Sequence, residues 1–64
     1  MSTGKRVQAL RQQRGWTQEQ LGNRVGISRR TVMRLENEQR KSVPVPLAKR
    51  FARVFQQPWT EFVQ

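Results

Sequence analysis

The chain has 64 residues, of which 13 are lysine or arginine and four are acidic, so its formal net charge is +9. A chain this short forms one domain at most and buries only about 60% of its unfolded surface. It contains no cysteine, histidine, aspartate or tyrosine, so it lacks thiolate ligands and most general bases, and we predict neither an enzyme nor a metal or cofactor site.

The first predicted element is a helix from about residue 5 to residue 14. Val7 and Leu10 lie on one side of this helix, and Gly15 ends it. Residues 1–4 offer no apolar anchor, and we expect them to be disordered.

A second helix is predicted over residues 17–25. Thr17 can cap it, and Gln20 occupies the third helical position, which is the spacing of a capping box. Trp16 precedes the cap, so we interpret it as a hydrophobic staple that packs toward Gln20 or Leu21. Stacking of Trp16 on a nucleic-acid base is the less favoured alternative.

A third helix is predicted over residues 28–37, after a tight turn in which Gly26 suits a positive φ angle. Ser28 can cap this helix, and Val32 and Leu35 point inward because they lie three residues apart.

The opposite face of the third helix is basic. At about 100° per residue, Arg30, Arg34 and Asn37 lie roughly opposite Val32. Arg29 projects from the first turn. A helix with an arginine-rich exposed face, held by a short turn, fits the major groove of DNA.

The remaining chain predicts two further helices. Pro44 and Pro46 keep the preceding segment extended, and a fourth helix follows over about residues 46–55. Pro58 then separates a short fifth helix over residues 58–63. The fourth helix has an apolar stripe of Leu47, Phe51, Val54 and Phe55, and its basic side chains are most simply solvated.

The central segment resembles the helix-turn-helix of the phage repressor and Cro family, also called the XRE family. The sequence TQEQL opens the segment and RLEN closes it, as is typical of that family. The resemblance implies an all-α, five-helix DNA-binding domain that spans residues 5–64. The family usually has a glycine-containing link before the fifth helix, whereas this chain has Gln56 and Gln57. The pattern of apolar and small positions is filled by Leu21, Gly22, Val25, Gly26, Ile27, Val32 and Leu35.

The resemblance also implies a salt bridge between Arg11 of the first helix and Glu36 of the third. In helical projection Glu36 lies about 40° from Val32, so it leans toward the interior. The alternative is that the two are surface charges that contribute little.

The same resemblance assigns base reading to the first two turns of the third helix, at Ser28, Arg29, Arg30 and Arg34. Arginine at these positions favours guanine, to which it can donate two hydrogen bonds. We expect one arginine, most simply Arg29, to pair with a phosphate or with Glu38 instead. Contacts to the DNA backbone are expected from Thr17, Gln18, Asn37, Arg40 and Lys41.

We therefore predict a repressor-like transcriptional regulator that binds double-stranded DNA sequence-specifically. Because one module has a small footprint, we expect a homodimer, at least on DNA. Trp59, Phe62 and Val63 are its candidate surface, although Trp59 and one of the other two are expected in the core. The predicted location is cytoplasmic, as a bacterial or phage nucleoid-associated protein, with neither a membrane nor a small-molecule partner. The alternatives are an antitoxin-like protein-interaction module or a non-specific nucleic-acid binder.

Overall fold

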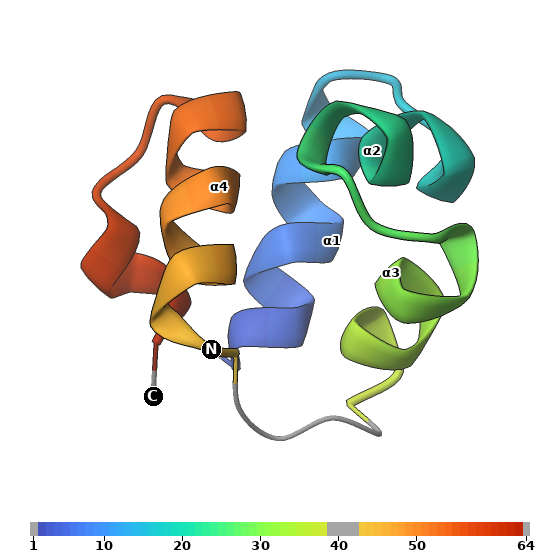
Figure 1. The fold of residues 1–64 in the computed structure, drawn as a ribbon. Coiled ribbons are helices and arrows are strands. Elements are labelled where there is room, and N and C mark those ends of the chain that lie inside the picture. Colours follow the sequence, from blue (N-terminus) through green and yellow to red (C-terminus); the bar gives the residue numbers. More distant parts are fainter. Residues whose placement is uncertain (1, 39–42, 64) are drawn as a thin grey trace.

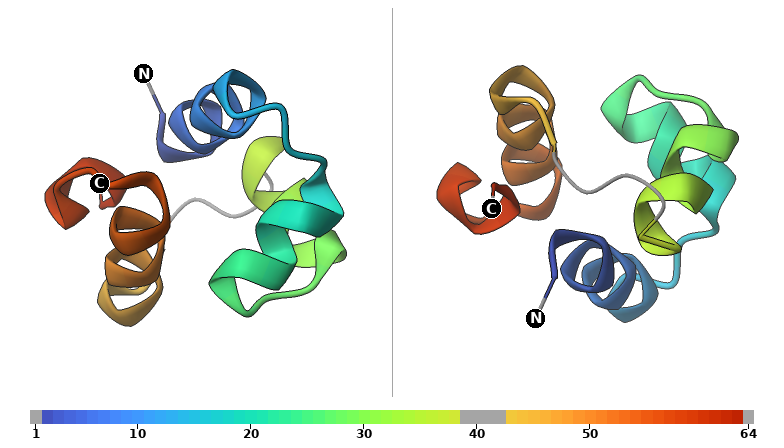
Figure 2. Two further views of the ribbon diagram at one scale, coloured as in Figure 1. Left: turned by 90° about the horizontal axis from the view of Figure 1, so that it is seen from above. Right: turned by 90° about the horizontal axis from the view of Figure 1, so that it is seen from below.

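The computed structural model describes residues 2–38 and 43–63, and this part of the chain contains α-helices and one 3-10 helix but no strand. Figure 1 shows α1 near the middle of the molecule, and Figure 2 shows α4 and η1 on the opposite side from α3. The elements are α1 (Thr3–Gln13), α2 (Gln18–Val25), α3 (Arg29–Glu36), α4 (Val45–Phe55) and η1 (Trp59–Phe62).

The fifth element is a 3-10 helix rather than the α-helix that we predicted. Only four residues follow Pro58 before the chain extends again at Val63. The amide of Glu61 donates to the carbonyl of Pro58 over 3.1 Å, which is the i to i−3 bond of a 3-10 turn. The all-α class is confirmed, but the count of five α-helices is not.

The predicted disorder of residues 1–4 is wrong for residues 2–4, because α1 begins at Thr3. The Ser2 hydroxyl accepts a hydrogen bond from the amide of Lys5 over 3.2 Å and caps the helix. Gly4 packs directly against the carbonyl of Leu35, where a β-carbon would collide. Met1 lies outside the described residues.

The turn between α2 and α3 depends on two glycines. Gly26 has φ +88° and ends α2, as predicted. At Gly22, a β-carbon would lie 2.5 Å from the carbonyl oxygen of Ile27. A side chain at this position would therefore push the turn away from α2, so Gly22 sets how closely the two helices approach.

The core is closed on the α4 side by three stacked phenylalanines. The ring centroids of Phe51 and Phe62 lie 5.8 Å apart, and those of Phe55 and Phe62 lie 6.1 Å apart. All three side chains are fully buried, and each such pair contributes about 0.5–1.5 kcal/mol beyond its buried area. They pack with the apolar residues of the first three helices, namely Val7, Leu10, Leu21, Val25, Val32 and Leu35.

Helix α4 ends with Gln56 in the left-handed conformation, at φ +56° and ψ +48°. Its amide donates to the carbonyl of Ala52, and so does the amide of Gln57 over 3.0 Å. Arg14, the C-cap of α1, also donates to the carbonyl of Phe55 over 2.8 Å. The last turn of α4 is therefore satisfied by the chain that follows it and by the end of α1.

Among the helices described here, none combines the length and the apolar composition that crossing a bilayer requires.

Candidate nucleic-acid interface

The two faces of α3 have opposite characters. Val32, Leu35 and Glu36 are buried, whereas Arg30 and Arg34 are exposed one helical turn apart. Arg29 is also exposed, and no described acidic side chain forms an ion pair with any of these three arginines. The outer face of α3 therefore presents cationic donors that are available to a partner outside the molecule.

Ser28 lies at the start of this face and has a structural role there. Its hydroxyl oxygen accepts a hydrogen bond from the amide of Thr31 over 3.2 Å and lies 3.0 Å from the Thr31 hydroxyl. The predicted cap of α3 is therefore confirmed, and it begins the helix one residue later than predicted, at Arg29. If Ser28 contacts a base, it does so with the same hydroxyl that already caps the first turn of α3.

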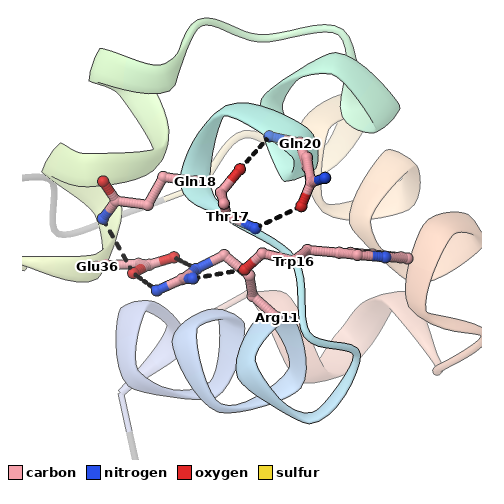
Figure 3. Close-up of polar contacts among 6 residues, drawn as sticks. All are labelled: Arg11, Trp16, Thr17, Gln18, Gln20 and Glu36. Atoms are coloured by element: carbon pink, nitrogen blue, oxygen red, sulfur yellow. Dashed lines mark hydrogen bonds and ion pairs between the residues drawn. The ribbon is translucent and has the colours of Figure 1, made fainter.

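The predicted capping box is present at the start of α2, as Figure 3 shows. The hydroxyl of Thr17 accepts from the amide of Gln20 over 3.0 Å, and the side-chain oxygen of Gln20 accepts from the amide of Thr17 over 2.8 Å. The first amides of a helix have no preceding turn to bond, and the helix dipole makes this end positive. The start of α2 is therefore suited to an anion such as a phosphate.

The ion pair between Arg11 and Glu36 ties α1 to the last turn of α3. Arg11 Nε donates to Glu36 Oε2 over 2.7 Å and Nη2 donates to Oε1 over 2.9 Å, so the pair is bidentate. Only 1% of the Glu36 side chain is exposed. The hydrogen bond that Arg11 donates to Glu36 raises the pKa of Arg11 above its ordinary value; burial lowers this pKa in part, and the negative charge of Glu36 raises it. Arg11 therefore carries its positive charge at neutral pH.

Gln18 joins this ion pair, a contact that we did not predict. Its side-chain nitrogen donates to Glu36 Oε1 over 3.2 Å, and Arg11 Nη1 donates to the carbonyl of Trp16 over 2.7 Å (Figure 3). Side chains from α1 and α2 thus converge on one buried carboxylate of α3. The spacing of Gln18, three residues before the buried Leu21, could have indicated that it leans inward.

The end of α3 carries the other predicted backbone contacts. Asn37 is exposed and forms the C-cap of the helix. Arg40 and Lys41, which we also expected to contact phosphates, lie outside the described residues. Within the described residues Glu38 forms no ion pair with Arg29, and its carboxylate accepts a hydrogen bond from the Ser2 hydroxyl.

The predicted dimer surface needs correction. Phe62 is fully buried in the aromatic stack and cannot take part in a surface contact. Trp59, which we expected in the core, is 38% exposed and has the Lys49 ammonium 5.6 Å from its ring centroid. Val63 is half-buried. Burial of one of Phe62 and Val63 agrees with the expectation, whereas the exposure of Trp59 does not, because η1 does not follow α-helical geometry.

Trp16 packs against the core, as we expected, but its stacking partner comes from α4. Its ring centroid lies 5.9 Å from that of Phe55, and the Arg24 guanidinium carbon lies 4.3 Å from the indole centroid. A partner 39 positions along the chain cannot be inferred from local periodicity.

Comparison of the sequence with models of known protein families shows to which family this domain belongs. A family model described as helix-turn-helix matches residues 7–62, which is most of the chain. The chain belongs to the XRE-type helix-turn-helix family. No curated protein sequence matches it. XRE-type domains belong to DNA-binding regulators and are typically not enzymes, and no group of side chains suited to a metal ion occurs within the described residues.

Proposed function

We propose that the protein is a repressor-like transcriptional regulator that binds double-stranded DNA sequence-specifically, with α3 in the major groove. The observation that carries this proposal is the exposed face of α3. There, Arg29, Arg30 and Arg34 project from a helix whose other face is fixed in the core. The major groove admits an α-helix, and arginine is the commonest side chain to read guanine there.

Arg30 and Arg34 are the proposed base readers, because they lie opposite the buried face of α3 and therefore deepest in the groove. Each bidentate contact to guanine O6 and N7 contributes about 1–3 kcal/mol of discrimination against the wrong base. Arg29 and Ser28 lie at the start of the helix, where they reach either a base edge or a nearby phosphate.

The proposed phosphate contacts begin at the start of α2. Thr17 and the first amides of this helix offer donors at the positive end of the helix dipole. Gln18 gives one amide hydrogen to Glu36 and keeps a second for a phosphate oxygen. Asn37, Arg40 and Lys41 supply the proposed contacts that follow α3.

We further propose that the protein binds DNA as a homodimer on half-sites about one helical turn apart. Trp59 and Val63 form the proposed contact surface, because both belong to the same end of the chain and Trp59 is the more exposed of the two. A single small domain buries too little DNA surface for tight binding, which is why a second copy is expected.

The test is selection of binding sites from a randomised duplex library, followed by sequencing. The native chain is expected to enrich a palindromic, guanine-containing motif. The variants Arg30→Ala and Arg34→Ala are each expected to lose stringency at one position of each half-site. Arg53→Ala removes an exposed arginine from α4, on the other side of the molecule, and is expected to leave the motif unchanged.

Two results would contradict the proposal. If all three variants lost affinity equally and no motif were enriched, the arginines would contribute charge alone and binding would be non-specific. If the enriched motif contained no repeated half-site, the dimer would be refuted while base reading by α3 would stand.

A further inference from the structure

A pocket lies where the end of α1, the helix α2 and the end of α4 meet. It is a hollow that is largely open to solvent, with a volume of about 510 Å³. It is lined by Arg14, Trp16, Arg24, Val54 and Gln56, none of which belongs to the proposed DNA-binding surface.

The pocket is cationic. Arg14 and Arg24 supply two guanidinium groups, and no acidic side chain lines the pocket. The ion pairs among the described residues are those of Arg6 with Glu61 and of Arg11 with Glu36, so neither pocket arginine is neutralised by a described carboxylate. The pocket therefore offers hydrogen-bond donors and positive charge, which suits an anion.

Arg14 is held in position before any ligand arrives. One of its terminal nitrogens donates to the carbonyl of Phe55 over 2.8 Å, and its guanidinium carbon lies 5.2 Å from the Phe55 ring centroid. A guanidinium has five N–H donors, so this bond leaves others for a ligand. A donor that is already ordered loses less conformational entropy when it binds.

Besides the two arginines and the polar Gln56, the pocket is lined by two apolar side chains. The Trp16 ring and the Val54 side chain are both half-buried and pack against the core. A bare inorganic ion would leave these surfaces wet, whereas an apolar group attached to the anion would cover them. We propose that this pocket binds a small organic acid, a carboxylate attached to an aryl or branched apolar body.

The pocket is separate from the proposed DNA contacts. In Figure 3 the Trp16 side chain extends toward α4, away from Gln18 and Glu36. A ligand at Trp16 would therefore not occupy the space in front of α3. This proposal departs from our expectation of no small-molecule partner. The expectation missed the site because the lining residues come from separate helices and meet only in the folded chain.

The test is a titration with sodium benzoate in the absence of DNA, observed through the indole N–H resonances in nitrogen-15 NMR spectra. The chain has two tryptophans, and Trp59→Phe identifies the signal of Trp16. A saturable shift of the Trp16 signal is expected, with little change at Trp59. Benzamide, which has the same ring without the charge, is expected to bind at least about tenfold more weakly, as is inorganic phosphate.

Three variants test the residues. Arg24→Gln is expected to weaken benzoate binding about tenfold, which is typical for the loss of a hydrogen bond to a charged group. Gln56→Glu adds a negative charge to the pocket and is also expected to weaken binding. Arg53→Gln makes the same charge change as Arg24→Gln at an exposed position of α4 that does not line the pocket, and is expected to leave the affinity within about twofold.

Three results would overturn the proposal. The first is the absence of a saturable shift at Trp16. The second is equal binding of benzoate, benzamide and phosphate. The third is an equal effect of the variants at positions 24 and 53, which would indicate attraction to the net charge rather than to the pocket. Because no DNA is present, none of these results bears on the DNA-binding proposal.

Discussion

At the scale of single residues, the buried carboxylate of Glu36 connects three helices. It accepts hydrogen bonds from Arg11 and Gln18, and Arg11 in turn holds the carbonyl of Trp16. The resemblance and the helical projection were enough to predict the partner Arg11. They did not predict Gln18, because its polar side chain at the start of α2 looked like a solvent or phosphate contact.

We expect Glu36→Gln to lower the free energy of unfolding by about 3–5 kcal/mol, because it leaves the largely buried Arg11 charge without its partner. Urea denaturation of the two proteins measures this difference. The matched control is Glu61→Gln, which breaks the half-exposed pair with Arg6 and should cost less than about 1 kcal/mol. Equal losses in the two variants would show that burial does not strengthen the pair.

The ion pair should also persist in alkaline solution. The pKa of Arg11 is raised above its ordinary value in the folded protein. The stabilisation that the ion pair gives is therefore fully present below the ordinary pKa of arginine, and it is lost only as pH rises through the raised pKa. We therefore expect the stability difference between native protein and Glu36→Gln to stay constant from about pH 7 to pH 10. Thermal unfolding at several pH values measures it, and a difference that shrank across this range would refute the expectation.

At the scale of elements, the caps and the turn of the helix-turn-helix were predictable, whereas most contacts between elements were not. Thr17, Ser28 and Gly26 act as their local spacing indicated. The first turn of α1 was missed because its order depends on Gly4 packing against Leu35, which is distant in sequence. The 3-10 geometry of η1 was missed because apolar spacing over so few residues does not distinguish the two kinds of helix.

Gln56 occupies a conformation that costs an ordinary residue about 1–2 kcal/mol. Glycine adopts it freely but loses about 0.5–1 kcal/mol through its more flexible unfolded state. Gln56→Gly is therefore expected to raise the stability by up to about 1 kcal/mol, seen as a higher thermal midpoint. Gln57→Gly should instead lower the thermal midpoint. Gln57 is not among the described residues with positive φ, so glycine relieves no strain there and only makes the unfolded state more flexible. A lower midpoint for Gln56→Gly would mean that its side chain stabilises the turn.

The two glycines Gly22 and Gly15 should respond differently to alanine. At Gly22 the new β-carbon meets the backbone of Ile27, so Gly22→Ala should displace α3 from α2 and weaken both folding and DNA binding. Gly15 has φ +70° but open space around it, so Gly15→Ala should cost only about 1–2 kcal/mol of backbone strain. Circular dichroism with thermal melting compares the two, and a larger loss at position 15 would contradict the steric argument.

At the scale of the whole molecule, the resemblance to the XRE family predicted an all-α DNA-binding domain, and the basic composition and the apolar periodicity agree with it. The expectation that Trp59 lies in the core was wrong, because its position depends on how the chain turns after α4. The pocket at Trp16 could not be predicted from the sequence for a related reason. Its lining residues are brought together only by the packing of α1, α2 and α4.

Trp59→Glu is expected to leave the fold intact, because exposed substitutions usually change stability by about 0.5 kcal/mol or less. It should abolish joint occupation of two half-sites by placing charges at the proposed contact between copies. Phe62→Ala should instead cost about 3–5 kcal/mol by opening a cavity in the core. Thermal melting measures the stabilities, and light scattering of the complexes with a palindromic duplex measures the assembly. If Trp59→Glu still bound this duplex two copies at a time, the contact would lie elsewhere.

The division of α3 into a buried face and an exposed face has a practical consequence. Arg29, Arg30 and Arg34 form no hydrogen bond or ion pair with another side chain in the described part of the chain, so folding does not depend on them. Random libraries at these three positions should therefore consist mostly of folded proteins. The domain is a scaffold on which new DNA targets could be engineered without redesigning the core.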